Sequence, residues 1–184
     1  MDSIVPALEA LLTGVKCLDL AILNAGILGT IRDMSQTPLK DLRSIMDINV
    51  WANKLILDWM HGTGLRVEQI VLISSGAAVN GSRGWGGYAL SKAALNMLTR
   101  LYAHELPDTH LCALAPGLID TAMQDYLCDA SQVNGSHFPS VQKLRDARGT
   151  PSMPSPEQAA RRIAAAIPEL KAYASGEFVD IRTL

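Results

Sequence analysis

Tyr88 and Lys92 are the two side chains of this 184-residue chain whose types and spacing most clearly suggest chemistry. They lie four positions apart in the segment Gly-Tyr-Ala-Leu-Ser-Lys, and residues four apart share one face of a helix. A positive charge about 4 Å from a phenol, at an effective dielectric constant of about 20, contributes roughly 4 kcal/mol. That is enough to lower a tyrosine pKa well below its ordinary value of about 10. The pair predicts a proton donor, although the same spacing also occurs on helices without a catalytic role.

Ser75 and Asn49 carry polar side chains at positions that the surrounding patterns make informative. The apolar segment 69–75 ends in hydroxyls and is followed by Gly76, which predicts a buried parallel strand with Ser75 at its carboxyl end. Ligands of open α/β sheets bind at that edge. Asn49 lies inside a long helical pattern. Each residue has a second interpretation, Ser75 as a cap of its strand and Asn49 as a hydrogen-bonding residue within its helix.

Helical and strand patterns alternate along the chain. Helices are expected near 3–13, 38–60, 87–105 and from 156 to about 167, and strands at 17–23, 69–75, 110–115 and 176–181. Such alternation implies an α/β fold with a parallel sheet and right-handed crossovers. The length and the 48% hydrophobic content suit a single domain that covers residues 1–184.

The stretch 123–156 interrupts this alternation. Asn134-Gly135 and several prolines break any long element there, and only 140–148 has the pattern of a short helix. We expect this stretch to form a lid over the substrate.

The motifs taken together resemble one known family. In chain order they are Asn24-Ala25-Gly26, Asn49, Ser75, Tyr88 with Lys92, and Pro116-Gly117 with Thr121. In this order and near this spacing they resemble the short-chain dehydrogenase/reductase family, over essentially the whole chain. The resemblance implies a partial Rossmann-type, doubly wound parallel sheet. The first βαβαβ half is expected to be missing, because the family's glycine-rich turn does not occur ahead of Asn24.

The resemblance implies catalytic roles for four residues. Tyr88 would protonate a carbonyl oxygen as hydride arrives from a nicotinamide cofactor. Lys92 would lower the pKa of the phenol and hydrogen-bond the ribose of the cofactor. Ser75 would donate to the same carbonyl oxygen, and Asn49 would hold a water molecule that links Lys92 to solvent. The implied activity is that of an NAD(P)H-dependent carbonyl reductase or alcohol dehydrogenase.

The resemblance also implies a set of cofactor contacts. They are Asn24, Ala25, Gly26, Lys92, Pro116, Gly117, Ile119 and Thr121. Glycine lets the backbone approach a flat ring closely, and a threonine near a helix start can offer its hydroxyl to the cofactor. Ordinary turn chemistry accounts for the same glycines and proline. Resemblance to one branch of the family implies NADP as the cofactor. NAD remains possible, because the residues that discriminate between the two normally follow the family's first and second strands.

Substrate residues are implied by resemblance to the sepiapterin reductase and benzil reductase branch of the family. Trp85 and Met123 would line the pocket of a ketone or dicarbonyl that is aromatic or similar to a pterin. Asp180, in a Val-Asp step near the carboxyl terminus, would anchor a guanidine-like edge. As alternatives, Trp85 and Met123 are core residues, and Asp180 is a solvated carboxylate at a strand end.

Composition narrows the class of partner. Sixteen basic and eighteen acidic residues give a net charge of −2, which argues against nucleic acid or an anionic membrane as a partner. No spanning or signal segment is apparent, so a cytoplasmic location is expected. Cys17, Cys112 and Cys128 lack metal-ligand spacing and favour buried, reduced thiols over a disulfide or a metal site. The family implies a small-molecule substrate and a homo-oligomer that associates through the helices at 38–60 and 87–105.

A non-enzymatic alternative follows from the expected missing half. Without the glycine-rich turn the chain loses amide donors that normally bind the pyrophosphate of the cofactor. The strand at 17–23 would also become an exposed sheet edge. The chain would then be an inactive, truncated relative that acts only as an oligomerisation or binding module.

Overall fold

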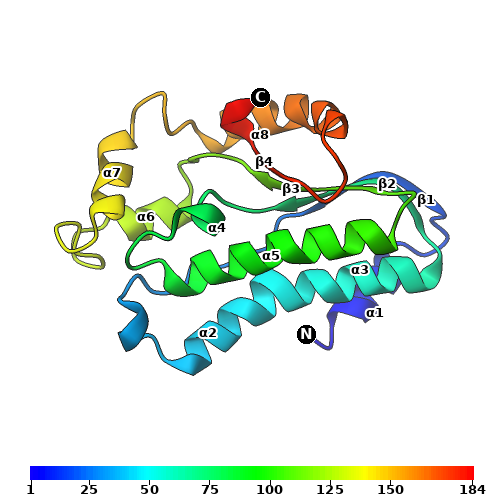
Figure 1. Ribbon diagram of the computed structural model, residues 1–184, viewed down its shortest axis with the longest axis horizontal. Helices are drawn as coiled ribbons and strands as arrows, with labels where there is room; N and C mark the ends of the chain where they lie inside the picture. The colour runs from blue at the N-terminus through cyan, green and yellow to red at the C-terminus, as the bar shows by residue number, and fades with distance from the viewer.

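A four-stranded parallel sheet forms the centre of the computed structural model, which describes residues 1–184. The strands are β1 (Cys17–Leu23), β2 (Arg66–Ile73), β3 (His110–Ala115) and β4 (Phe178–Asp180), and they follow one another in the order β1-β2-β3-β4. All three pairings are parallel. The predicted α/β fold with a parallel sheet is therefore confirmed (Figure 1).

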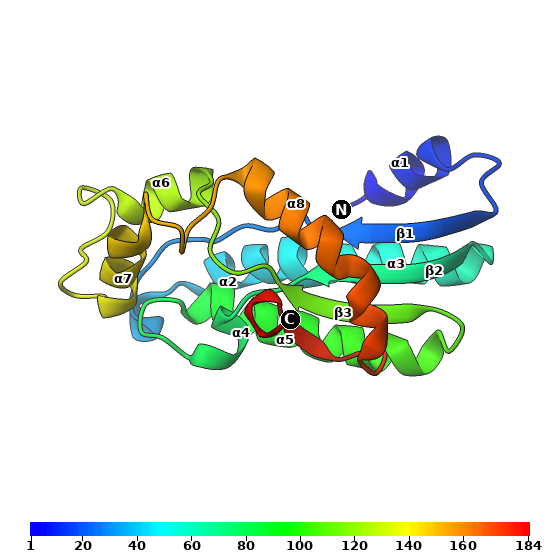
Figure 2. The same ribbon diagram turned by 90° about the horizontal axis from the view of Figure 1, so that it is seen from above.

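Helices cover both faces of the sheet. The α-helices are α1 (Ile4–Leu11), α2 (Leu39–Met46), α3 (Ala52–Thr63), α4 (Ala77–Asn80), α5 (Gly86–Glu105), α6 (Ala122–Cys128), α7 (Pro139–Ala147) and α8 (Pro156–Ala166). Helices α3 and α5 lie side by side on one face, and α8 crosses the other (Figures 1 and 2). None of the eight combines the length and the apolar character that crossing a bilayer requires.

Strand β2 shows why the inner strands are apolar throughout. Ile70 and Leu72 point to the cluster formed with α3 and α5, whereas Val71 between them points to the cluster formed with α8. Because successive side chains of a strand alternate between faces, a strand covered on both sides needs apolar residues at every position.

Strand β1 is one of the two edges of the sheet and is only partly covered. It pairs with β2 alone, and its Leu20 and Ile22 remain 38% and 45% exposed. The expected exposed edge is thus present, with one row of backbone groups outside the ladder. Cys17 at the start of this strand is exposed, so the expectation of a buried thiol is wrong there, whereas Cys112 on the inner strand β3 is buried.

Element boundaries differ from the sequence prediction in three informative places. Strand β2 runs from Arg66 to Ile73, which leaves Ser75 two residues beyond the strand. The helix expected at 38–60 is present, but a π-helical turn at Asp47–Trp51 separates α2 from α3. Helix α6 follows β3 after a short connection. The sequence did not predict it, because the glycines and prolines of 123–156 indicate an irregular segment.

Candidate active site

The predicted residues Ser75, Tyr88, Lys92 and Asn49 come from elements that meet at the carboxyl ends of the strands. Ser75 follows β2, Tyr88 and Lys92 occupy the first two turns of α5, and Asn49 lies in the π-helical turn. Right-handed crossovers bring the segment after each parallel strand to the same edge of the sheet, which explains why residues far apart in sequence gather there.

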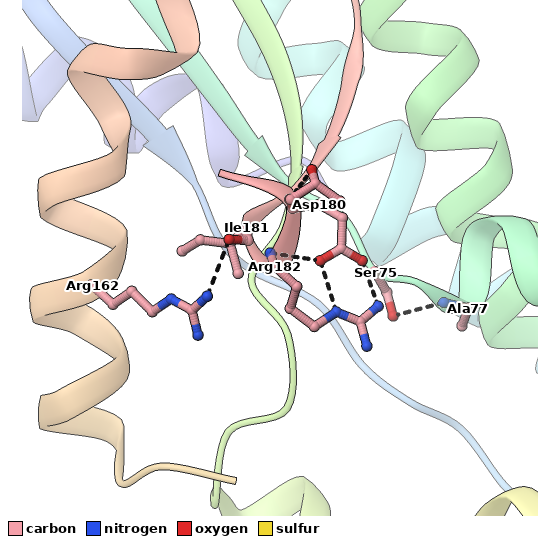
Figure 3. A network of polar contacts seen from close by, with 7 residues as sticks. Ser75, Ala77, Arg162, Asp180, Ile181 and Arg182 are labelled. Atoms are coloured by element: carbon pink, nitrogen blue, oxygen red, sulfur yellow. Dashed lines mark hydrogen bonds and ion pairs between the residues drawn. The ribbon is translucent and has the colours of Figure 1, made fainter. Parts of the chain in front are cut away.

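The side chains of Tyr88 and Ser75 interact with each other. Burial raises the pKa of Tyr88, and a hydrogen bond with the Ser75 side chain partly offsets that rise. The Ser75 hydroxyl in turn accepts a 3.1 Å hydrogen bond from the backbone N–H of Ala77, which fixes its direction (Figure 3). The two hydroxyls can therefore approach one acceptor atom jointly.

Lys92 lies behind the phenol as a buried ammonium. It is 3% exposed, its Nζ donates a 2.6 Å hydrogen bond to the carbonyl oxygen of Ile73, and the same Nζ lies 5.8 Å from the centre of the Tyr88 ring. Burial lowers the pKa of Lys92 to about 8.

The expected depression of the Tyr88 pKa by Lys92 is wrong for this structure. Burial of the phenol dominates the pKa of Tyr88 and raises it. The ammonium is placed over the ring and bonded to the carbonyl oxygen of Ile73, and burial disfavours the charge that would have stabilised a phenolate.

Asn49 ties the segment after β1 to the helices. Its Oδ1 accepts a 2.8 Å hydrogen bond from the N–H of Ile27, and its Nδ2 donates to the carbonyl oxygen of Ile27 at 2.9 Å and to the hydroxyl of Ser91 at 2.9 Å. Its own carbonyl oxygen accepts from Asn53 at 2.8 Å. The side chain thus fixes the loop after Asn-Ala-Gly, and the water-holding role expected of Asn49 stays a prediction.

Replacement of Asn49 by alanine is expected to lower the free energy of unfolding by about 2–4 kcal/mol. The substitution leaves both backbone groups of Ile27 without their partner, and each unpartnered buried group costs about 1–3 kcal/mol. Urea unfolding followed by circular dichroism measures the change. Asn80→Ala, at an exposed position, is the matched control and should change stability by less than about 0.5 kcal/mol. Equal effects of the two substitutions would show that the hydrogen bonds from Asn49 to Ile27 do not stabilise the fold.

Gly26 lies closely against the side chains of Asn49 and Lys92. A β-carbon at Gly26 would stand 3.3 Å from Asn49 Oδ1 and 3.4 Å from Lys92 Nζ. An ammonium has three N–H donors, and one of those on Lys92 is used by Ile73. The free donors beside a residue without a side chain suit the hydroxyls of a ribose, so these residues fit the nicotinamide-ribose part of a dinucleotide.

The other predicted cofactor residues lie on the same edge. Asn24 and Ala25 are exposed after β1, and Pro116, Gly117 and Ile119 are half-buried after β3. Thr121 is the residue before α6, and its side chain makes no capping hydrogen bond with that helix. Its hydroxyl therefore stays available to a ligand.

Trp85 and Met123 share an apolar cluster with Tyr88. Both pack against a buried group contributed by the loop after β1 and by the segment from α6 to α7, and Leu118 and Tyr126 belong to the same wall. The Trp85 and Tyr88 ring centres are 6.1 Å apart. Trp85 Nε1 also donates a 2.8 Å hydrogen bond to Ser140 in α7. Sequence patterns gave no sign of these two residues, because Leu118 is a single apolar residue in a connection and Tyr126 lies in a helix of only seven residues.

Asp180 is paired with Arg182, which the sequence prediction did not single out. Arg182 donates from Nε to one carboxylate oxygen at 2.8 Å and from Nη2 to the other at 2.5 Å (Figure 3). These bonds hold the pKa of Asp180 below its ordinary value. The carboxylate expected to meet a guanidine-like edge of a substrate already binds a guanidinium of its own chain.

Comparison with known proteins assigns the class. Residues 1–132 match the family model described as short chain dehydrogenase, which is more than half of the chain. The chain therefore belongs to the short-chain dehydrogenase family, a family of oxidoreductases, as the sequence motifs predicted.

Curated relatives of the chain include both reductases of the expected branch. An uncharacterized oxidoreductase of Schizosaccharomyces pombe is 38% identical over 58% of this chain and 44% of its own. Benzil reductase ((S)-benzoin forming) of Bacillus subtilis is 30% identical over 73% and 57%, and sepiapterin reductase of Bos taurus is 30% identical over 68% and 49%. The chain spans about half the length of the curated relatives it matches.

Solved structures show the same fold. A short-chain dehydrogenase/reductase of Saccharomyces cerevisiae superposes with a TM-score of 0.81 at 21% identity, covering 98% of this chain and 73% of that one. An NAD+-bound xylitol dehydrogenase gives 0.75 at 20% identity over 98% and 74%. A Burkholderia multivorans protein with bound NADP gives 0.70 at 20% identity over 97% and 69%.

Proposed function

We propose that this chain carries the catalytic part of an NAD(P)H-dependent carbonyl reductase that acts on a ketone or dicarbonyl. The observation that carries the proposal is the placement of Tyr88 and Ser75 together at the carboxyl ends of the strands, with the buried Lys92 Nζ 5.8 Å from the centre of the Tyr88 ring. Two hydroxyls aimed at one point can bind a carbonyl oxygen, and one of them can give up a proton to it.

The ribose side of the cofactor would be held by Lys92, Gly26, Asn24 and Ala25. Its nicotinamide would be surrounded by Pro116, Gly117, Ile119 and Thr121. When bound, the cofactor supplies the hydride. NADP is the proposed form, with NAD as the alternative. The superposed structures include one with NAD+ and one with NADP.

Tyr88 acts as the proton donor in this proposal. Its raised pKa keeps the phenol protonated near neutral pH, which is the form that reduction of a carbonyl needs. Ser75 donates to the same oxygen and stabilises the negative charge that develops on it. Lys92, with its pKa of about 8, can exchange protons near neutral pH, and Asn49 would hold the water through which it does so.

The substrate would lie against Trp85 and Met123, with 123–156 as its lid. The hydrogen bond from Trp85 to Ser140 joins the pocket wall to α7 within that lid segment, so movement of the lid would change the shape of the pocket. Aromatic walls favour a substrate with aromatic rings such as benzil, the compound after which the Bacillus subtilis relative is named. Asp180 would contribute by orienting Arg182.

Ser75→Ala tests the proposed site. We expect kcat/KM for benzil to fall about 10²-fold, because one donor to the developing oxyanion is lost. The assay follows loss of NADPH absorbance. Ser74→Ala is the matched control: the Ser74 hydroxyl donates to Asn96 at 2.5 Å and so points away from the substrate, and its removal should leave kcat/KM within about threefold. An unchanged rate in Ser75→Ala would remove Ser75 from the mechanism.

A second candidate function is that of an oligomerisation or binding module without activity. The unpaired edge of β1, with Leu20 and Ile22 exposed, favours it, because such an edge can bind another strand. Exposed Leu90, Met97 and Leu101 on α5 also support the homo-oligomer that the family implies. An absence of NADPH oxidation with every dicarbonyl, in a protein that self-associates, would favour this function.

A further inference from the structure

Arg182 lies at the border of the candidate active site. Its Nη2 is 3.5 Å from the place that a β-carbon on Gly76 would take, next to Ser75. Its Cγ and Cδ are 3.9 and 4.0 Å from the corresponding place at Gly117. The guanidinium thus stands between the segment after β2, which carries the candidate oxyanion donor, and the segment after β3, beside which the nicotinamide would lie (Figure 3).

Asp180 holds this guanidinium in a fixed direction. The paired bonds from Nε and Nη2 restrict rotation of the planar group, while Nη1 lies outside the pair and points away from the carboxylate (Figure 3). The side chain of Arg182 is 59% exposed, so Nη1 can meet a ligand. A planar guanidinium with its orientation preset is well suited to binding a carboxylate.

The charge around Arg182 remains positive despite its partner. Arg162 in α8 donates to the carbonyl oxygen of Ile181 at 3.2 Å and acts on Asp180 through its charge (Figure 3). Two guanidinium groups therefore act on one carboxylate, Arg182 through hydrogen bonds and Arg162 through its charge alone. A second anion can be accommodated there, whereas a cationic or guanidine-like group would meet an occupied carboxylate and two positive charges.

We infer that Arg182 selects carbonyl substrates that carry a carboxylate next to the reacting ketone, as in a 2-keto acid. This inference rests on the proposed reductase function. The ketone oxygen would lie at Tyr88 and Ser75, and the adjacent carboxylate would accept a hydrogen bond from Arg182 Nη1. Asp180 is the positioning residue for that contact. The same arrangement disfavours substrates with a guanidine-like edge.

Benzoylformate and its methyl ester form a matched pair of probes, because they differ in charge but share the aromatic ketone. Titration calorimetry without cofactor should show that the protein binds benzoylformate about tenfold more tightly than the ester. Arg182→Gln should weaken binding of benzoylformate by about 10- to 100-fold, the range of one charge-assisted hydrogen bond, and leave the ester within about twofold. Arg182→Lys should recover part of the loss. Arg161→Gln, which removes an exposed arginine of α8, should change neither.

The outcomes separate this inference from the proposed function and from an alternative anion. Equal weakening of both probes, or no preference of the unsubstituted protein for the carboxylate, would overturn the inference. If Arg182→Gln binds NADPH more weakly but binds benzoylformate as before, then Arg182 binds an anionic group of the cofactor. That result would also overturn the inference. Carboxylate-selective binding through Arg182 without any NADPH-dependent reduction would support the inference and refute the proposed reductase function.

Discussion

Tyr88→Phe is expected to lower kcat for NADPH-dependent reduction of benzil by about 10³-fold, within the range of 10² to 10⁴ that a positioned general acid contributes. The ring keeps its place in the apolar cluster beside Trp85, so the variant should fold normally. It loses only the hydroxyl, which in the proposed mechanism gives its proton to the carbonyl oxygen. Affinity for NADPH should stay the same, because Lys92 holds the ribose in the proposed complex.

Tyr173→Phe is the control for this substitution. Tyr173 is half-buried in the cluster on the α8 face of the sheet, on the other side from Tyr88. Its replacement by phenylalanine likewise removes one phenolic hydroxyl. Its kcat should stay within about twofold of the unsubstituted value. Full activity in Tyr88→Phe, or an equal loss in Tyr173→Phe, would eliminate Tyr88 as the proton donor.

Lys92→Met is expected to change how stability depends on pH. The pKa of Lys92 is about 8 in the folded protein, lowered by burial from its ordinary value of 10.5, which the unfolded chain retains. Below about pH 8 both states carry the proton, and the folded protein bears the full cost of the buried charge. As pH rises from about 8 to 10.5 the unfolded state binds more protons, so the stability of the unsubstituted protein rises. Between about pH 8 and 10.5 the free energy of unfolding of the unsubstituted protein should rise by about 3 kcal/mol relative to that of Lys92→Met.

Urea unfolding of both proteins at several pH values between about 7 and 10.5 measures that difference. Lys143→Met, at an exposed position of α7, should give a curve parallel to that of the unsubstituted protein. Parallel curves for Lys92→Met as well would show that Lys92 is not buried as a charged group. The same variant should have little reductase activity, since its side chain can bind neither a ribose hydroxyl nor a proton.

The sheet could be predicted because its inner strands must be apolar at every position. Segments such as 110–115 are short, apolar and bounded by turn residues, and they alternate with helical patterns long enough for crossovers. The start of β2 was placed three residues late, because Arg66 and Glu68 are charged and lie where the strand leaves the core. Helix α6 was missed because seven residues contain too few turns for a periodic pattern.

The candidate site was partly predictable for a similar reason. Ser75, Tyr88 and Lys92 carry their chemistry in residue type and spacing, and the fold brings them together. Arg182 was not foreseen, since its position next to Gly76 and Gly117 depends on how β4 ends against two distant loops. The rise in the Tyr88 pKa also depends on burial, which the spacing of Tyr88 and Lys92 along a helix does not determine.

Deuterium labelling of the cofactor shows whether the protein transfers hydride from the nicotinamide to the carbonyl carbon. The protein is incubated with benzil and NADPH deuterated at both C4 positions of the nicotinamide, and the benzoin product is analysed by mass spectrometry. We expect one deuterium on the carbinol carbon of benzoin formed by the unsubstituted protein, and we expect product formation by Tyr88→Phe to be reduced about 10³-fold. Benzoin without deuterium, or no benzoin from the unsubstituted protein, would contradict hydride transfer to a carbonyl held at Tyr88 and Ser75.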